Sequence, residues 1–518
     1  MNRRYGGMLR SLRPVACSGV ARVPVRLGVS TGSRVGVRFE STSTVSDESP
    51  FKVAIVGSGP AGFYTAYRLL SKLPNARVDM FEALPAPFGL SRFGVAPDHP
   101  EVKNCQEKFE EVAGWTNFRF FGNVSVGDIH KNENETVSLE QLHNNYNSIV
   151  LAYGSSKDRL LGVKGEELAG VMSARQFVGW YNGHPEFGYL NPPLEDAEDA
   201  IIVGNGNVAL DVARMLLSDL SRLKSTDITE QAYETLKKSR VKNVRIVARR
   251  GLLQSAFTTK EVRELVREPG AALVPLEEQY MEPYRQFGQF LDRKTKRLIQ
   301  VLDKAREENE KKENVNKSWR LDYLRSPVQF YKHGTDERLL SSAKFQVNTL
   351  IQDDIKSPAS AVATDDSVMY KCELAFRSIG YNAVPLRGFE ELSIPFDTKR
   401  GAVANEYGRV VTIDRDSGHA KALPGYYVAG WVKNGPTGVI AETMRESFEV
   451  AETILEDYYS GKLDTQTRAG YEGLNVGWKS ISWADWLKID QAEKERGKMV
   501  GKEREKFASV EEMMNVVS

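Results

Sequence analysis

Two glycine-rich segments, each between an apolar run and a helix-forming run, constrain the fold of this chain more than any other feature. The first, GSGPAG at residues 57–62, directly follows the β-branched run at 53–56. The second, GNGNVA at residues 204–209, follows a similar run at 200–203. A strand, a tight glycine turn and a helix, in this order, begin a dinucleotide-binding βαβ unit. The chain is therefore predicted to be an α/β protein with two Rossmann-like dinucleotide-binding domains.

The three glycines of the first segment have different predicted roles. Gly57 permits the tight turn, Gly59 lets a pyrophosphate approach the backbone, and Gly62 lets helix and strand pack closely. Glu82 ends the next predicted strand, about 20 residues further on, where a carboxylate accepts hydrogen bonds from ribose hydroxyls. An acid at this position favours FAD or NAD and disfavours a nucleotide with a 2′-phosphate.

The second segment has Ala209 in place of the third glycine, and no acid ends its returning strand. The strand at 244–247 is followed instead by Arg249 and Arg250. A guanidinium pair matches a 2′-phosphate because its planar fork binds phosphate oxygens bidentately. This predicts NADP(H), with two solvated surface arginines as the alternative interpretation. An insertion near residues 226–237 makes this unit longer than usual.

A third glycine-rich turn, GPTGVI at 435–440, follows the predicted strand that ends at Gly430. It is expected to return the chain to the first domain and to place Trp431 and residues 438–440 beside a flavin. The expected organisation is one dinucleotide domain with the second inserted into it. The predicted boundaries are 1–45 for a targeting segment, 51–152 and 373–518 for the FAD domain with a C-terminal helical extension, and 153–372 for the NADP domain.

The first forty residues differ in composition from the rest of the chain. They are rich in arginine, serine and apolar residues, and Glu40 is their first acid. This composition is typical of a mitochondrial transit peptide, and a disordered basic arm is the alternative. Cleavage is expected between Arg38 and Pro50.

Several missing features limit the chemistry. The three cysteines, Cys17, Cys105 and Cys372, form neither a redox CxxC nor an iron–sulfur ligand set. The net charge of +1 gives no nucleic-acid signature, no apolar run is long enough to span a membrane, and no metal site is predicted. Electrons must therefore leave to an external acceptor or to oxygen. His99 and Asp211 are the candidate polar groups at the junction of the two domains, and no catalytic acid or base is assigned.

From about residue 51 to the C-terminus, the chain resembles the mitochondrial NADPH:adrenodoxin (ferredoxin) reductase family. The motifs that carry the resemblance are VGSGPAG at 56–62, FGLSR at 88–92, FGVAPDHP at 93–100, EVKN at 101–104, NGNVALDVAR at 205–214 and GPTGVI at 435–440. The resemblance implies an FAD domain interrupted by an NADP domain. It also implies transfer of single electrons to a small [2Fe–2S] ferredoxin in the mitochondrial matrix, with at most peripheral contact to the inner membrane.

The resemblance also assigns residues. At FAD it places Ala61, Glu82, Leu90, Val126, Trp431, Gly438, Val439 and Ile440, with Gly438 also touching nicotinamide. On the NADP phosphates it places Asn205, Gly206, Asn207 and Val208, and around the adenosine end Arg249, Arg250 and Glu261. Asn205 stands where this family often has glutamine, a change that shortens the side chain and keeps the backbone.

Two alternative functions remain open from the sequence. One is an NADPH-dependent flavin monooxygenase, and the other is a degenerate flavoprotein retained for protein interaction. For the favoured reductase, a local basic face must attract the acidic ferredoxin because the whole chain is nearly neutral. The expected docking residues are Arg263, Arg267, Arg293, Lys294, Lys296 and Arg297, and a solvated helix surface is the alternative. The pathway that consumes the electrons, either steroid hydroxylation or iron–sulfur or haem cofactor synthesis, is left open.

Overall fold

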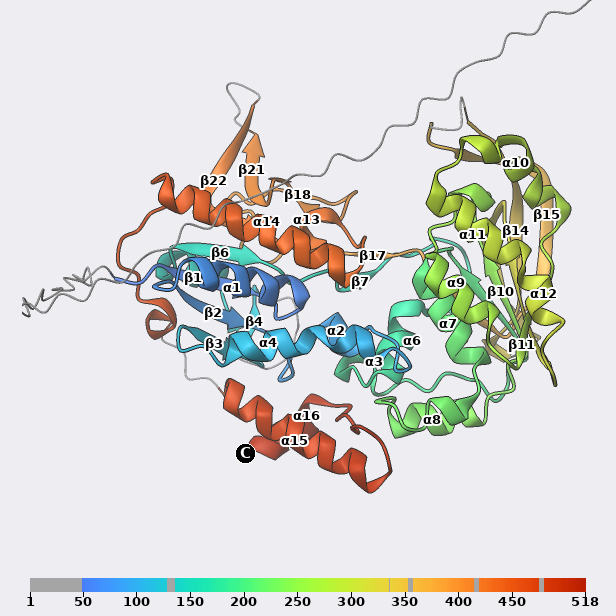
Figure 1. Ribbon diagram of the computed structural model, residues 1–518, viewed down its shortest axis with the longest axis horizontal. Helices are drawn as coiled ribbons and strands as arrows, with labels where there is room; N and C mark the ends of the chain where they lie inside the picture. Colours follow the sequence, from blue (N-terminus) through green and yellow to red (C-terminus); the bar gives the residue numbers. More distant parts are fainter. Residues whose placement is uncertain (1–48, 128–135, 335, 353–356, 414–418, 475–478) are drawn as a thin grey trace, which may run out of the picture. The chain divides into compact units, whose positions relative to one another are not determined.

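The computed structural model describes residues 49–127, 136–334, 336–352, 357–413, 419–474 and 479–518. The expected transit peptide at 1–45 lies outside the described residues. A seven-stranded sheet has the order β20-β21-β22-β6-β1-β2-β3 (Figure 1). Its strands are β1 (Lys52–Val56), β2 (Arg77–Phe81), β3 (Phe118–Phe121), β6 (Ser148–Leu151), β20 (Asn405–Glu406), β21 (Arg409–Ile413) and β22 (Ala420–Val428).

Strand β1 lies inside the sheet, and its two faces are buried in two different hydrophobic cores. Val53 and Ile55 pack into the core that includes α1 (Pro60–Lys72), α4 (Cys105–Ala113) and α14 (Ile440–Tyr459). Ala54 and Val56 pack into the core that includes α5 (Leu139–Asn145). A strand covered on both faces requires a continuous apolar run, which is what the sequence has.

A six-stranded parallel sheet has the order β11-β12-β10-β9-β16-β8. Its strands are β8 (Val171–Ser173), β9 (Asp199–Val203), β10 (Asn243–Val247), β11 (Ala271–Leu273), β12 (Lys317–Asp322) and β16 (Leu374–Arg377). All of them lie between β6 and β20 in the sequence. The expected fold class, with one dinucleotide-binding unit inserted into the other, is therefore confirmed.

One predicted boundary is wrong by a few residues. Strand β16 pairs with β9 and β8 in the second sheet, so the expected start of the returning part at residue 373 falls too early. The apolar run at 374–376 identified a strand, but its periodicity could not identify the sheet to which it belongs. Below, the second lobe is Val171–Arg377, and the first lobe is the described chain before Lys157 and after Asn382.

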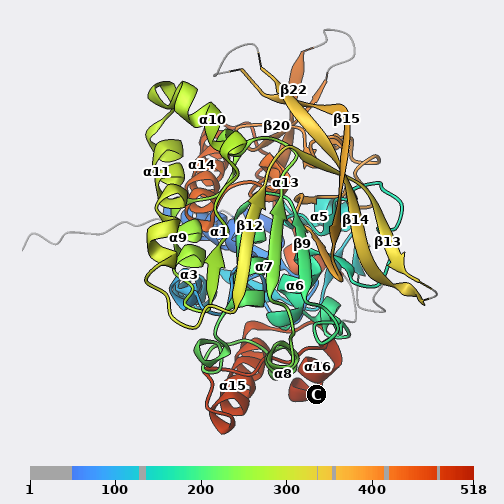
Figure 2. The same cartoon turned by 90° about the vertical axis from the view of Figure 1, so that its right-hand side faces the viewer.

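Helices and a further sheet cover the two faces of the second parallel sheet. The helices are α6 (Ala174–Tyr181), α7 (Asn207–Leu217), α8 (Glu230–Lys237), α9 (Thr259–Val266), α10 (Glu278–Phe287), α11 (Arg293–Asp303) and α12 (Ala305–Asn309). Strands β13 (Arg325–His333), β14 (Asp336–Ile351) and β15 (Ser360–Lys371) form a long antiparallel sheet (Figure 2). Ile201 and Val203 of β9 share a core with Phe330 and Phe345 of this sheet, which the sequence did not predict.

Two short strands join the lobes. Strand β7 (Lys157–Asp158) leads into the second lobe, and β17 (Tyr381–Asn382) leads out of it. The two pair in antiparallel register, so the outgoing and returning connections are hydrogen-bonded to each other. Among the residues described, no helix is long and apolar enough to cross a membrane.

The C-terminal helices α15 (Trp483–Met499) and α16 (Val510–Val517) belong to the first lobe. Trp486, Ile489 and Met513 are fully buried in the core that also contains α1 and α14. The segment between the helices, residues 500–509, is called the C-terminal strap below.

Candidate functional site

The first glycine loop lies between β1 and α1 and has the geometry of an anion cradle. Gly57 has φ +103°, and a Cβ there would lie 2.6 Å from the carbonyl oxygen of Ala152. A Cβ on Gly62 would overlap the carbonyl oxygen of Gly57. A Cβ on Gly59, by contrast, would meet no atom within 4 Å. Helix α1 begins at Pro60 without a side-chain cap, so the N–H groups of Ala61 and Gly62 have no capping side chain and can bind phosphate.

Glu82 lies beside this loop. One of its carboxylate oxygens accepts hydrogen bonds from the backbone N–H of Ser58 at 3.0 Å and from the Ser58 hydroxyl at 2.6 Å. The other oxygen accepts from the N–H of Leu84 at 3.1 Å. The acid identified by its spacing is therefore held at the mouth of the glycine loop, and its contact with a ribose stays a prediction.

The closing segment packs against the start of α1. Gly430 has φ +68°, and a Cβ there would lie 2.6 Å from the Cβ of Ala61. Helix α13 (Trp431–Asn434) follows directly, and the ring of Trp431 stacks on Tyr381 with 5.7 Å between centroids. Residues 437–439 are exposed and lead into α14. Ala61 and Trp431, two of the predicted flavin contacts, thus come together at the start of α1.

The remaining two predicted FAD residues differ in exposure. The loop before Leu90 passes the cradle closely, since a Cβ on Gly89 would lie 3.1 Å from Gly59 Cα. Leu90 itself is 41% exposed. Val126, in β4 (Ser125–Val126), is buried in the core on the α5 side of the sheet. Their contacts with FAD stay predictions.

The second glycine loop repeats the geometry of the first. Gly204 has φ +132°, and a Cβ there would overlap the carbonyl oxygen of Ser378. A Cβ on Gly206 would meet no atom within 4 Å. Helix α7 begins after Gly206 without a side-chain cap. This loop can therefore hold a second pyrophosphate.

The two asparagines of this loop use their side chains within the protein. Asn205 Nδ2 donates to the carbonyl of Gln254 at 3.3 Å, and Asn207 Oδ1 accepts from the N–H of Thr258 at 2.8 Å. Both bonds attach the loop to the segment before α9. The uncapped backbone of Gly206, Asn207 and Val208 is then the part of the loop open to phosphate.

Arg249 and Arg250 follow β10 after one intervening residue, Ala248, and are both exposed. Neither guanidinium has an acidic partner within the described ranges, whereas Arg245 of the same strand is paired with Asp322. Two unpaired cations at the end of the strand provide a site for a dianionic 2′-phosphate.

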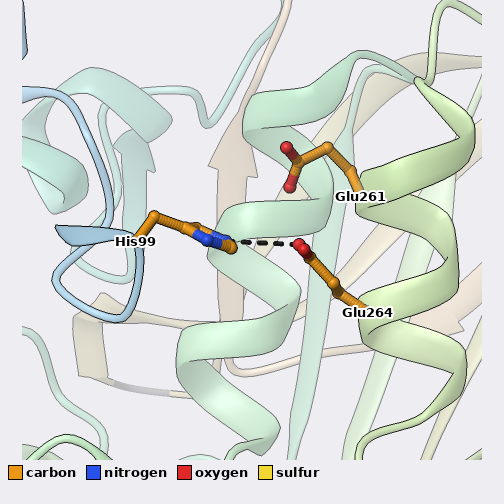
Figure 3. Close-up of side chains that lie close together, drawn as sticks. All are labelled: His99, Glu261 and Glu264. Carbon is orange, nitrogen blue, oxygen red and sulfur yellow. Dashed lines mark ion pairs between the residues drawn. The ribbon is translucent and has the colours of Figure 1, made fainter. Parts of the chain in front are cut away.

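His99 and two glutamates form a cluster that joins the lobes (Figure 3). The Nε2 atom of His99 lies 3.2 Å from a carboxylate oxygen of Glu264. Its Nδ1 atom lies 3.4 Å from a carboxylate oxygen of Glu101. Glu261 is on the same face of α9 as Glu264, and one ligand atom from each of these two residues and His99 lie within 4.8 Å of one another. Glu264 was not predicted, although its spacing of three from Glu261 on a helix indicates a shared face.

Glu261 has an unusual electrostatic environment. Burial, followed by the nearby carboxylates of Asp211 and Glu264, raises its pKa to about 7. One of its oxygens is buried without a hydrogen-bond partner in the described part of the chain. This side chain can therefore be protonated or ionised near neutral pH.

Asp211 is a member of a buried ion-pair network. Arg214 Nη2 donates to it at 2.6 Å, and Arg214 Nη1 also pairs with Asp98 of the first lobe. The Arg214 side chain is only 4% exposed. His99 therefore contacts the second lobe directly through Glu264, whereas Asp211 is linked to the first lobe only through Arg214, which pairs with Asp98.

A basic groove lies between α9 and α11 on the second lobe. Its cavity of about 630 Å³ is lined by Arg263, Arg267, Arg297 and Lys304, with Glu308 as its acid. These four cations form no ion pair within the described residues. Of the other expected docking residues, Arg293 and Lys294 are exposed on α11, and Lys296 donates to the carbonyl of Gln289.

Comparison with known proteins gives consistent similarities. The family model described as pyridine nucleotide-disulphide oxidoreductase matches residues 51–270, which include both glycine loops. The chain is 43% identical to NADPH:adrenodoxin oxidoreductase, mitochondrial, of Salvelinus fontinalis, covering 93% of each chain. It is 41% identical to the Homo sapiens protein of the same name, covering 91% of this chain and 93% of that one.

Solved structures agree with these sequence similarities. The structure of the Mycobacterium tuberculosis oxidoreductase FprA in complex with NADPH is 34% identical and has a TM-score of 0.78. The match covers 90% of this chain and 99% of FprA. The likeness therefore includes both lobes.

Proposed function

Because the chain belongs to the family of mitochondrial NADPH:adrenodoxin oxidoreductases, we propose that it passes electrons from NADPH, through FAD, to a [2Fe–2S] ferredoxin. The chain is an oxidoreductase, and its cofactors are FAD and NADP(H). When bound, FAD accepts an electron pair as hydride and releases electrons one at a time. We place the enzyme in the mitochondrial matrix, with residues 1–45 as the transit peptide.

The presence of two glycine cradles with oppositely charged strand ends carries this proposal. Both cradles have an open central glycine and an uncapped helix start, so both fit a pyrophosphate. Glu82 marks the cradle that fits FAD, and Arg249 and Arg250 mark the one that fits NADPH. The monooxygenase alternative is not favoured, since the relatives named above are reductases.

We assign the FAD contacts to Gly57, Gly59, Ala61, Gly62, Glu82, Leu90, Val126, Trp431 and residues 438–440. We assign the NADP contacts to residues 205–208, Arg249, Arg250 and Glu261. Hydride transfer between stacked rings requires orientation more than an acid or base. The contribution of the chain is therefore to hold the two nucleotides in register.

A reduction assay tests the function. The purified flavoprotein should reduce cytochrome c with NADPH only when a [2Fe–2S] ferredoxin is added. Oxygen uptake that depends on an organic substrate would instead support a monooxygenase, and the absence of bound flavin would support a degenerate protein.

We propose that the ferredoxin docks at the basic groove between α9 and α11. Four cations without an ion pair in the described part of the chain concentrate positive charge in one groove, although the net charge of the chain is only +1. Such a patch attracts an acidic partner and acts mainly on the association rate. Arg293, Lys294 and Lys296 extend the charge along α11.

Charge reversal tests the docking site. The double variant Arg263→Glu/Arg297→Glu should raise the apparent KM for ferredoxin by about tenfold and flatten its dependence on salt. Reduction of ferricyanide by NADPH should stay near normal. Lys237→Glu, a reversal on the exposed α8, is the matched control. Unchanged ferredoxin kinetics in the double variant would place the docking site elsewhere.

A further inference from the structure

The C-terminal strap starts and ends in the first lobe, and several of its residues also contact the second lobe. The backbone N–H of Glu503 donates to the carbonyl of Ser225 at 3.4 Å. Lys502 pairs with Glu230 at 3.0 Å, and the N–H of Glu230 donates back to Glu505 at 2.9 Å. The strap is thus anchored to the segment that opens α8.

Asp227 is the centre of these contacts. Its carboxylate pairs with Lys103 of α3 (Pro100–Lys103) at 2.5 Å and with Lys506 of the strap at 2.8 Å. Lys506 also donates to the backbone carbonyl of Arg92 at 3.3 Å. Three segments that are far apart in sequence meet at one carboxylate.

These groups are almost completely shielded from solvent. The side chain of Lys506 is 1% exposed and that of Asp227 is 9% exposed. Removal of either partner leaves a buried charge without compensation, so the cluster strongly selects one arrangement of the three segments. A surface ion pair would not have this selectivity.

A second buried cluster supports the strap from the side of the first lobe. Arg92, in α2 (Leu90–Phe93), donates to both carboxylate oxygens of Glu493 at 2.6 and 2.7 Å. Arg504 of the strap donates to the same carboxylate at 3.0 Å. The strap therefore holds the loop that begins at Arg92 and continues to Asp98 and His99, which contact the second lobe.

We propose that Lys506 and Asp227 are positioning residues, which fix the second lobe on the first so that nicotinamide and flavin meet in a reactive geometry. This inference rests on the proposed function. A displacement of about 1 Å from the reactive geometry costs on the order of a hundredfold in rate, even when the change is far from the chemistry. Neither residue needs to touch a nucleotide to have this effect.

The cluster also predicts a pH dependence. Burial, followed by the neighbouring cations Lys103 and Arg92, lowers the pKa of Lys506 to about 7, against the opposing effect of Asp227. The ammonium group is therefore present below pH 7 and is lost as the pH rises above it. The rate of flavin reduction should decline above this pH, as a charge-assisted bond becomes a neutral one.

Stopped-flow reduction of the holoenzyme by NADPH tests the proposal. Lys506→Met and Asp227→Asn should each slow flavin reduction at saturating NADPH by about ten- to a hundredfold, and leave the Kd for NADP⁺ within about twofold. Lys506→Arg, which keeps its charge, should recover most of the rate and remove the inflection near pH 7. Lys488→Met, at an exposed pair on α15, is the control.

Hydrogen exchange provides a readout that does not depend on activity. The Glu230 amide, which donates to the strap, should exchange faster in Lys506→Met and Asp227→Asn than in the wild type. If a variant fails to fold, Lys103→Met removes the more accessible partner of the same carboxylate. Normal flavin reduction in folded variants would overturn the positioning role, as would an equal loss in rate and affinity. Failure of NADPH to reduce the wild-type flavin would instead overturn the proposed function.

Discussion

The two glycine loops have nearly the same backbone and opposite charges beside it. In each, the first glycine has a positive φ and no room for a Cβ, the second is open, and an uncapped helix follows. The difference lies at the end of the next strand, where Glu82 follows β2 and Arg249 and Arg250 follow β10. We propose that the loops bind what the two nucleotides share, a pyrophosphate, and that the strand ends select between the nucleotides.

The loops also differ in what holds them in place. In the first, the selecting acid itself is bonded to the loop through Ser58. In the second, Asn205 and Asn207 bond to the segment before α9, and the guanidinium groups of Arg249 and Arg250 have no acidic partner among the residues that the structure describes. If these residues select the nucleotides as we propose, selection of FAD is built into the structure of its loop, whereas selection of NADPH can be changed without disturbing the loop.

The largest effect is expected at the first glycine of each loop. Gly57→Ala and Gly204→Ala combine a positive φ with a clash against a backbone carbonyl, and each should greatly reduce the yield of soluble protein. Gly154→Ala, which has φ +73° and open space, isolates the cost of the φ alone, about 1–3 kcal/mol. Thermal unfolding measures these differences. If Gly57→Ala is as stable as Gly154→Ala, the close contact at Ala152 is not significant.

Substitution of the second glycine should affect a different cofactor in each loop. A side chain on Gly59 or Gly206 meets no protein atom, so Gly59→Val and Gly206→Val should fold and fill the space intended for phosphate. We expect Gly59→Val to be isolated without flavin. We expect Gly206→Val to retain flavin and to lose most of its affinity for NADPH. Absorbance spectra and NADP⁺ titrations distinguish the two outcomes, and a normally flavinated Gly59→Val would overturn the assignment of the first loop to FAD.

At the strand ends the effect should be smaller and selective. Neutralising Arg249 and Arg250 removes two charge-assisted bonds of about 1.5–3 kcal/mol each. NADPH should then bind about a hundredfold or more weaker, since every 1.4 kcal/mol is about tenfold, and NADH should change little. Measured KM values for both nucleotides give the answer. Equal losses with NADPH and NADH would show that these arginines do not bind the 2′-phosphate.

The smallest effect concerns Glu261, beyond the second loop. Its pKa of about 7 in the folded state exceeds the ordinary value of 4.5, so the folded protein binds the extra proton between these values. Stability should therefore fall as the pH rises from about 4.5 to 7. Glu261→Gln should remove this part of the pH dependence, with a gain of less than about 1 kcal/mol at pH 8 because the group is partly solvent-screened. Melting curves of the wild type and Glu261→Gln at pH 5 and pH 8 measure this difference. The same pH dependence in both proteins would contradict the expectation.

The parts of the fold that the sequence predicted are those with local signals. Both βαβ units were found because the glycine loop, the apolar run before it and the helix-forming run after it are adjacent in the sequence. The sheet of β13, β14 and β15 was missed, since β15 is exposed along most of its length and has no clear apolar alternation. The sheet membership of β16 was wrong for a similar reason, because one apolar run fits either sheet.

The site shows the same limit. Glu82 and the arginine pair were predicted because each comes at the end of the strand that returns after its glycine loop and helix. Glu264 was missed because its contact with His99 joins residues from different lobes. The pairing of Asp227 with Lys103 and Lys506 has no local signal at all, since these residues come from three separate segments.

The pairing of β7 with β17 has a consequence for the order of folding. Strand β22 completes the first sheet beside β6, although Leu151 and its partner Val428 are separated by the entire second lobe. Closing a loop of this length in an unfolded chain is entropically costly and slow. If the second lobe folds first, its two connections, β7 and β17, are already hydrogen-bonded to each other. The long loop between β6 and β22 is then closed before these two strands pair. A chain emerging from N- to C-terminus would then complete its NADPH unit before its FAD unit, and the flavin would be captured last.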